Sequence, residues 1–170
     1  MEGSPGGLNA EAGAMWTYPS SVPIRATMLL CDAAQAVDGK LYILGGGWNT
    51  IGPDPAPTAV ALYVEIPWDM TNVKHPWRLE LLDADDQPVQ VPTPQGERPL
   101  VVEGELEVGR PPGVTPGIGL GVPLAINIGP LPLALGRRYV WRLSIHGESE
   151  DTWRLPFSTR AAPGAAPTTE

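Results

Sequence analysis

Apolar and polar side chains alternate along most of this chain with a period of two residues. In the segment 59–68, Val60, Leu62 and Val64 fall on one side of an extended backbone, while Glu65 falls on the other. This period is typical of a β-strand with one buried and one solvated face. Eight segments show it: 24–31, 40–44, 59–68, 77–81, 100–108, 122–128, 139–145 and 153–157. The pattern predicts an all-β chain of about eight antiparallel strands.

Glycine and proline separate these segments. The chain has 20 Gly and 21 Pro, and many of them lie between the apolar runs, for example at 53–57 and 111–116. Because proline has no N–H to donate to a hydrogen-bond ladder, this punctuation favours turns and short strands over long helices. We therefore expect a single antiparallel β-sandwich. An immunoglobulin-like Greek key is favoured, and another eight-stranded sandwich is the alternative.

The immunoglobulin-like expectation rests on the segment 133–145. It resembles the penultimate strand of immunoglobulin-like sandwiches, in which a tyrosine at the strand start bonds back to the preceding corner. Tyr139 stands at that position, and Trp141 stands where antibody domains carry a cysteine. We expect Trp141 to fill the core in place of a disulfide. Upstream, residues 79–91 are expected to form a hairpin around the acidic turn 83–87.

The composition of the two ends differs from that of the middle. Residues 1–22 and 161–170 consist mainly of Gly, Ala, Ser, Pro and Thr with few large apolar side chains. Such segments bury too little apolar surface to order themselves. We expect disordered tails at 1–22 and 161–170 around one β-sandwich domain at 23–160.

The net charge and the number of cysteines limit the partners and the cellular compartment that we expect for this protein. The net charge is −8 (11 basic and 19 acidic residues), with no basic stripe, which excludes nucleic acid and an anionic membrane surface as expected partners. The N-terminus lacks the basic and apolar regions of a signal peptide, and no apolar run reaches the roughly 18 residues of a membrane helix. Cys31 is the only cysteine, so no internal disulfide can form. These features predict a cytoplasmic protein.

Catalytic and metal-binding patterns are weak. A reactive thiol needs a base or a positive neighbour, and the only histidines, His75 and His146, stand at no recognised spacing from Cys31. By alternation Cys31 shares a face with Arg25, Thr27 and Leu29, opposite Met28 and Leu30. An inert small apolar residue at a strand end is the favoured interpretation. A zinc site of Cys31, His75 and His146 lacks the close ligand pairs of zinc motifs. We expect no catalytic residue, no metal and no cofactor.

The acidic turn at Asp83, Asp85 and Asp86 begins like a calcium-binding EF-hand loop. Pro88 and Pro94 then occupy the positions where that loop needs its glycine and its bidentate glutamate. A solvated turn is favoured, and a calcium site at a sandwich end remains the alternative.

Several stretches of the chain resemble an uncharacterised family of small bacterial proteins of actinobacterial type. The most distinctive is the segment 29–48, LLCDAAQAVDGKLYILGGGW; the others are VALYVEIPWD, RLELLDADDQPV, PLAINIGPLPL, GRRYVWRLSI and LPF. The resemblance covers most of residues 24–158. It implies an all-β fold, and it implies no activity and no catalytic or binding residue.

Two hypotheses about function follow. The first is a non-enzymatic binding or assembly module that acts through the faces, edges or loops of the sandwich, with a protein partner or a second copy as its target. Its expected exposed contact residues are Asp32, Gln35 and Trp48. The alternative is an enzyme or a small-ligand or sugar-binding protein whose site lies in the loops 32–40, 83–97 and 109–121. Asp32, His75, His146 and Trp48 are the residues expected near such a site.

Overall fold

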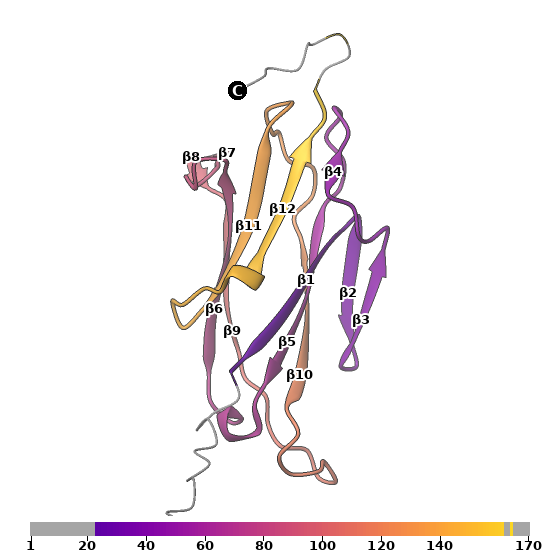
Figure 1. Cartoon of the computed structure of the whole chain (residues 1–170), viewed down its shortest axis with the longest axis vertical. Helices are drawn as coiled ribbons and strands as arrows, with labels where there is room; N and C mark the ends of the chain where they lie inside the picture. The colour runs from indigo at the N-terminus through magenta and orange to yellow at the C-terminus, as the bar shows by residue number, and fades with distance from the viewer. Residues whose placement is uncertain (1–22, 162–163, 165–170) are drawn as a thin grey trace, which may run out of the picture.

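The computed structural model describes residues 23–161 and 164, and in this part the chain is all-β apart from two short 3₁₀ helices, η1 (Trp68–Met70) and η2 (Asp151–Trp153). Figure 1 shows the strands, which run nearly along the long axis of the molecule. They are β1 (Arg25–Cys31), β2 (Ala33–Val37), β3 (Lys40–Leu44), β4 (Thr50–Ile51), β5 (Ala59–Ile66), β6 (His75–Asp83), β7 (Gln90–Thr93), β8 (Gly96–Pro99), β9 (Val101–Leu106), β10 (Leu120–Asn127), β11 (Arg138–Ile145) and β12 (Arg154–Thr159).

Two of the sheets are built from strands distant in sequence. The first has three antiparallel strands in the order β1-β5-β10, and β5 in its centre places Val60 between Leu30 and Ile126. The second has five strands in the order β4-β12-β11-β6-β9. It is antiparallel except for the short pairing of β4 with β12, which is parallel.

One hydrophobic core joins these two sheets. The buried cluster contains Leu30 and Leu62 from the three-stranded sheet together with Leu79, Trp141 and Leu143 from the five-stranded sheet. These side chains are almost completely inaccessible to solvent. Since they are the residues that alternation places on the apolar side of each strand, the predicted phase of the strands is confirmed.

The corner before β11 forms as its sequence predicts. The hydroxyl of Tyr139 donates to the carbonyl of Ala134 (3.3 Å) and accepts from the amide of the same residue (3.1 Å). Trp141, two residues later, is 1% exposed and lies between Leu81 of β6 and Leu155 of β12. A large apolar ring therefore occupies this part of the core.

The arrangement is more divided than the single sandwich of about eight strands that we expected. Two hairpins, β2–β3 and β7–β8, form separate two-stranded sheets. Loop 32–40 was expected to be irregular, yet β2 pairs with β3 along five residues across the turn at Asp38 and Gly39. The segment AAQAV of β2 lacks large β-branched or aromatic side chains, so its strand signal is weak. β7 and β8 each contain a proline, a residue that is uncommon in strands, so their strand signal is weak as well.

The expected hairpin 79–91 is present only near its turn. The carboxylate of Asp83 accepts the backbone N–H groups of Asp85 and Gln87 (both 2.9 Å), and Leu82 forms an isolated bridge with Pro88. One further hydrogen bond, from the N–H of Val89 to the carbonyl of Leu81 (2.9 Å), forms before the chain continues into β7.

Two expectations lie largely outside the described residues. These are the disordered tails at 1–22 and 161–170. Among the residues that are described, no helix is long and apolar enough to cross a membrane.

Candidate binding surface

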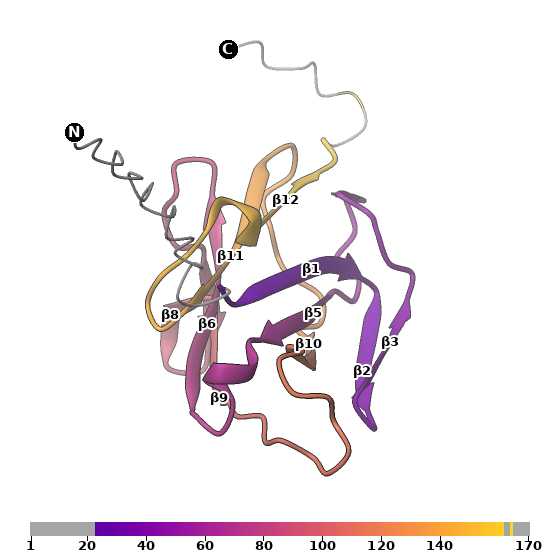
Figure 2. The same cartoon turned by 60° about the horizontal axis from the view of Figure 1, so that its bottom comes forward.

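The β2–β3 hairpin lies against the side of the three-stranded sheet that faces away from the five-stranded sheet (Figures 1 and 2). Ala34 of β2 belongs to a small buried cluster with Cys31, Ala59 and Ala61, and Leu41 of β3 packs on it. These short side chains on β1 and β5 let the hairpin approach the sheet closely. A second core of small residues therefore holds the hairpin in place.

The side chain of Asn127 ties the outer edge of β2 to the end of β10. Its amide nitrogen donates to the carbonyl of Ala34 (2.9 Å), and its amide oxygen accepts from the N–H of Ala34 (3.1 Å). This pair of hydrogen bonds imitates one step of a β-ladder. It satisfies backbone groups that the edge of β2 would otherwise leave open.

The opposite face of the hairpin is also apolar, and it is exposed. Val37, Tyr42 and Leu44 are 46%, 54% and 69% accessible to solvent. A hollow of about 440 Å³ lies beside them and is lined by Ala33, Ala34, Gln35, Tyr42, Ile43, Leu44 and Asn127, none of which is charged. We call Val37, Tyr42 and Leu44 with this hollow the hairpin surface. Of the three predicted contact residues, only Gln35 lies on it.

The other two predicted contact residues, Asp32 and Trp48, meet each other. The indole Nε1–H of Trp48 donates to Asp32 Oδ1 (3.1 Å), and a side chain at Gly45 would meet Asp32 Oδ2 at 2.0 Å. Trp48 is half-buried, packs on the main core and makes an edge contact with Phe157 of β12 (ring centroids 6.3 Å apart). This geometry gives the pair a structural role, in which Asp32 and Trp48 close the glycine segment after β3.

Cys31 lies beneath the hairpin, fully buried in the small-residue core. Its Sγ contacts the carbonyl oxygen of Ala59 at 3.6 Å. Burial is the main reason that the pKa of the Cys31 thiol is raised above its ordinary value, and the nearby charge of Asp32 adds to the effect. A thiol that is buried and protonated is a poor nucleophile.

We predict that Cys31 resists thiol–disulfide exchange with an added reagent while the protein is folded. At pH 8, an aromatic disulfide reagent should modify it on the order of a hundredfold more slowly in buffer than in denaturant. The raised pKa also stabilises the fold below the ordinary thiol pKa of about 8.5, and this contribution is lost as the pH rises through the folded-state pKa. A Tyr63→Cys variant, whose thiol would stand on the exposed face of β5, is the fast-reacting control. Equal rates for Cys31 in the two solvents would contradict its burial.

The two histidines come together, although neither meets Cys31 in a metal site. His75 is completely buried, and its Nε2–H donates to the carbonyl of Met70 (2.9 Å). Because a carbonyl can only accept, His75 Nδ1 in the neutral ring accepts from Nε2–H of His146 (2.8 Å). Over the described ranges 23–161 and 164, no group of three or more His, Cys, Asp or Glu could hold a metal ion. The pair therefore joins β6 to the turn after β11.

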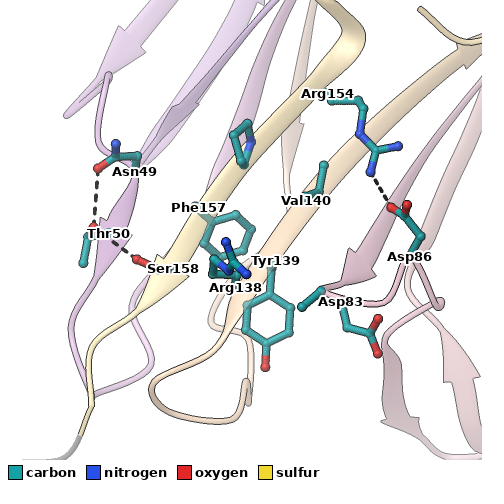
Figure 3. Close-up of a pocket in the computed structure, with 12 residues that line it drawn as sticks. Asn49, Thr50, Asp83, Asp86, Arg138, Tyr139, Val140, Arg154, Phe157 and Ser158 are labelled. Carbon is teal, nitrogen blue, oxygen red and sulfur yellow. Dashed lines mark hydrogen bonds and ion pairs between the residues drawn. The ribbon is translucent and has the colours of Figure 1, made fainter. Parts of the chain in front are cut away.

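A second hollow, of about 440 Å³, lies on the outer face of β11 and β12 (Figure 3). Asp86 of the acidic turn reaches across it to pair with Arg154. On the same face, Arg142 donates to Glu80 at 2.9 Å, and Glu80 is nearly buried. Asp86 at this hollow and Glu80 beside it are each paired with an arginine. The carboxylate of Asp83 thus stabilises the acidic turn, and the carboxylate of Asp86 connects that turn to β12.

Sequence reasoning missed Tyr42, Leu44 and Asn127. Tyr42 and Leu44 belong to the predicted strand 40–44. Their apolar side chains would also be expected if both faces of that strand were buried, so the sequence alone does not mark them as exposed. Asn127 gave a usable signal, since it is the one polar amide in the apolar run PLAINIGPLPL.

Comparison with known proteins identifies the chain at the level of its family. No curated protein and no solved structure matches it. A model of a family of unknown function (DUF6941) matches residues 26–158, most of the chain and nearly the span of the expected resemblance. The chain belongs to this family of unknown function.

Proposed function

We propose that this protein is a non-enzymatic binding or assembly module and that the hairpin surface is the place where it meets its partner. One observation carries the proposal: β2–β3 is apolar on both faces, and only one face is covered. Ala34 and Leu41 pack on the small-residue core, while Val37, Tyr42 and Leu44 point away from it.

Hairpins at the surface of a β-protein usually pair an apolar inner face with a polar outer face. Apolar side chains that gather on an outer face, rather than lying singly, mark interaction sites. Five of the nine large apolar side chains exposed in the described part of the chain belong to residues 29–44. Their concentration in one segment supports a binding role for it.

The chemistry of the hairpin surface favours a protein partner. The lining of the hollow has no charged residue, whereas the whole chain carries −8. Tyrosine and leucine supply contact area, and Gln35 and Asn127 supply amide donors and acceptors at the rim. A nucleic acid would require several basic side chains, and residues 33–44 carry one, Lys40.

The proposal includes an immunoglobulin-like topology for the two main sheets. If β1, β5, β6, β10, β11 and β12 are lettered A, B, C, E, F and G, the strand orders read A-B-E and G-F-C. The hydrogen bonds of Tyr139 to the preceding corner support the same reading. The cytoplasmic location stays a prediction.

The test uses a pair of matched substitutions. Leu44→Glu places a charge on the hairpin surface, and Leu135→Glu places the same charge on an exposed leucine of the loop before β11. Tagged wild-type protein and both variants are purified from cells that express the gene natively, and the proteins recovered with them are quantified. We expect Leu44→Glu to recover about tenfold less partner, as for the loss of a central contact, and Leu135→Glu to behave as wild type. Undiminished recovery with Leu44→Glu would refute the proposal.

A further inference from the structure

The free edge of β3 presents unpaired backbone groups. The turn at Asp38 and Gly39 has positive φ at both residues (51° and 70°), as in a two-residue type I′ hairpin. In such a hairpin Val37 and Lys40 exchange both hydrogen bonds, and bonded pairs then recur at every second residue. The N–H and C=O groups of Leu41 and Ile43 therefore point away from β2. Within the described residues, no hydrogen bond to these four groups is formed.

On the other edge of the hairpin, Ala34 and Ala36 of β2 face outward, and the backbone groups of Ala34 are satisfied. The outward N–H and C=O of Ala34 bind the side chain of Asn127. Ala34 pairs with Ile43 across the ladder. Since the backbone groups of Ala34 bind outside the hairpin, those of Ile43 must also face outward, as the type I′ turn requires. Among the described residues, neither of the two outward-facing residues of β3 has such a partner.

Two other sheet edges in this molecule carry features that block pairing. β9, at one edge of the five-stranded sheet, carries Glu103 and Glu105, and β10, at one edge of the three-stranded sheet, contains Pro123, which removes a donor. The sequence of β3, Lys-Leu-Tyr-Ile-Leu, contains no proline and no acidic residue. An apolar, unblocked edge strand is a template for pairing with another strand.

We propose that β3 pairs antiparallel with β3 of a second copy of this chain, across a two-fold axis that passes beside Tyr42. This inference rests on the proposed function and names the partner of the same surface. Leu41 of each copy then lies opposite Ile43 of the other, which forms four backbone hydrogen bonds. The two Tyr42 side chains face each other on the exposed side, and a four-stranded sheet, β2-β3-β3-β2, results.

The charge of the hairpin favours a second copy as the partner, and the area that the pairing buries sets the strength of the contact. Two copies that each carry −8 repel, so they can meet only where acidic charge is balanced. On residues 33–44 the charged side chains are Asp38 and Lys40, which sum to zero. The pairing buries on the order of 500 Å² per copy, below the roughly 800 Å² of a standard interface, which places the dimer among weak and reversible complexes. We expect a dissociation constant of tens of micromolar.

Disulfide trapping tests the register directly. Facing residues of a non-bonded antiparallel pair have Cα atoms about 4.5 Å apart, within the range that a disulfide spans. Tyr42→Cys is compared with Tyr63→Cys, a substitution of a tyrosine that is 43% exposed on β5. Both are oxidised at about 100 μM protein and separated without reductant. The buried Cys31 keeps the wild-type protein unlinked.

We expect most of Tyr42→Cys to become covalent dimer at a rate at least tenfold above that of Tyr63→Cys. Sedimentation equilibrium of the wild-type protein should show a monomer–dimer equilibrium over the same concentrations. Equal cross-linking of the two variants, or a strict monomer at several hundred micromolar, would overturn the inference. If Leu44→Glu still loses its partner in that case, the hairpin surface binds a different protein and the proposed function stands. If the dimer is absent and Leu44→Glu also loses no partner, the proposed function fails as well.

Discussion

Replacement of Trp141 by alanine is expected to lower the free energy of unfolding by about 3–5 kcal/mol, the cost of removing a large aromatic side chain from a packed core. Trp141 is 1% exposed and lies in the core cluster that both main sheets share. Its neighbours on β6 and β12, Leu81 and Leu155, belong to the same sheet and cannot close the cavity without a shift of their strands. Urea unfolding followed by circular dichroism measures the change.

Because a domain of this size is stable by only about 5–15 kcal/mol, Trp141→Ala can leave too little folded protein to measure. Trp141→Phe removes less volume and should cost about 1–2 kcal/mol. Val73→Ala, at an exposed apolar position, is the control and should change the stability by less than about 0.5 kcal/mol. A loss below 1 kcal/mol for Trp141→Ala would contradict the shared core.

Gly45→Ala is expected to be the most damaging alanine substitution in the segment that follows β3. Gly45 has φ +60°, which strains any residue with a Cβ, and the new Cβ would lie 2.0 Å from Asp32 Oδ2. Asp32 must then move, and the hydrogen bond that it accepts from Trp48 is lost. Strain and contact together should cost about 2–4 kcal/mol.

Gly47→Ala separates the two causes. Gly47 has φ +94°, but nothing lies within 4 Å of the position of its Cβ, so this variant pays only for backbone strain, about 1–2 kcal/mol. The difference between the two variants in thermal or urea unfolding measures the contact with Asp32. Tryptophan fluorescence should also change in Gly45→Ala, because Trp48 loses its carboxylate partner. If the two variants are equally stable, the interpretation of Asp32 and Trp48 as a structural pair is wrong.

The alternation of residues was sufficient to predict the main strands and their buried faces. Val60, Leu62 and Val64 lie in the core as the period of two requires, and Trp141 fills the place predicted for it. Tyr139 bonds to the preceding corner because that contact is local, spanning only five residues. Patterns of this kind are visible in a sequence because each depends on one strand or one turn.

Contacts between distant segments were not predictable in the same way. The pairing of Asn127 with Ala34 joins residues 93 positions apart, and the meeting of His75 with His146 joins residues 71 apart. Asp32 and Trp48 were expected as exposed contacts because each follows an apolar strand. Only the fold shows that the two side chains turn toward each other.

The hairpin surface could not be predicted from the sequence either, and the reason is physical. The apolar residues of 40–44 occupy both faces of β3, and a sequence cannot tell whether the second face is covered. In the structure, Leu41 contacts the small-residue core, whereas Tyr42 and Leu44 contact solvent. The open side of this hairpin is therefore the feature that the fold adds to the account.

The central claim is that this protein acts through the hairpin surface, and the most direct measurement is the recovery of a partner protein with Leu44→Glu relative to Leu135→Glu. The account predicts a recovery about tenfold lower for Leu44→Glu, with circular dichroism showing both variants folded. Equal recovery by two folded variants would contradict it.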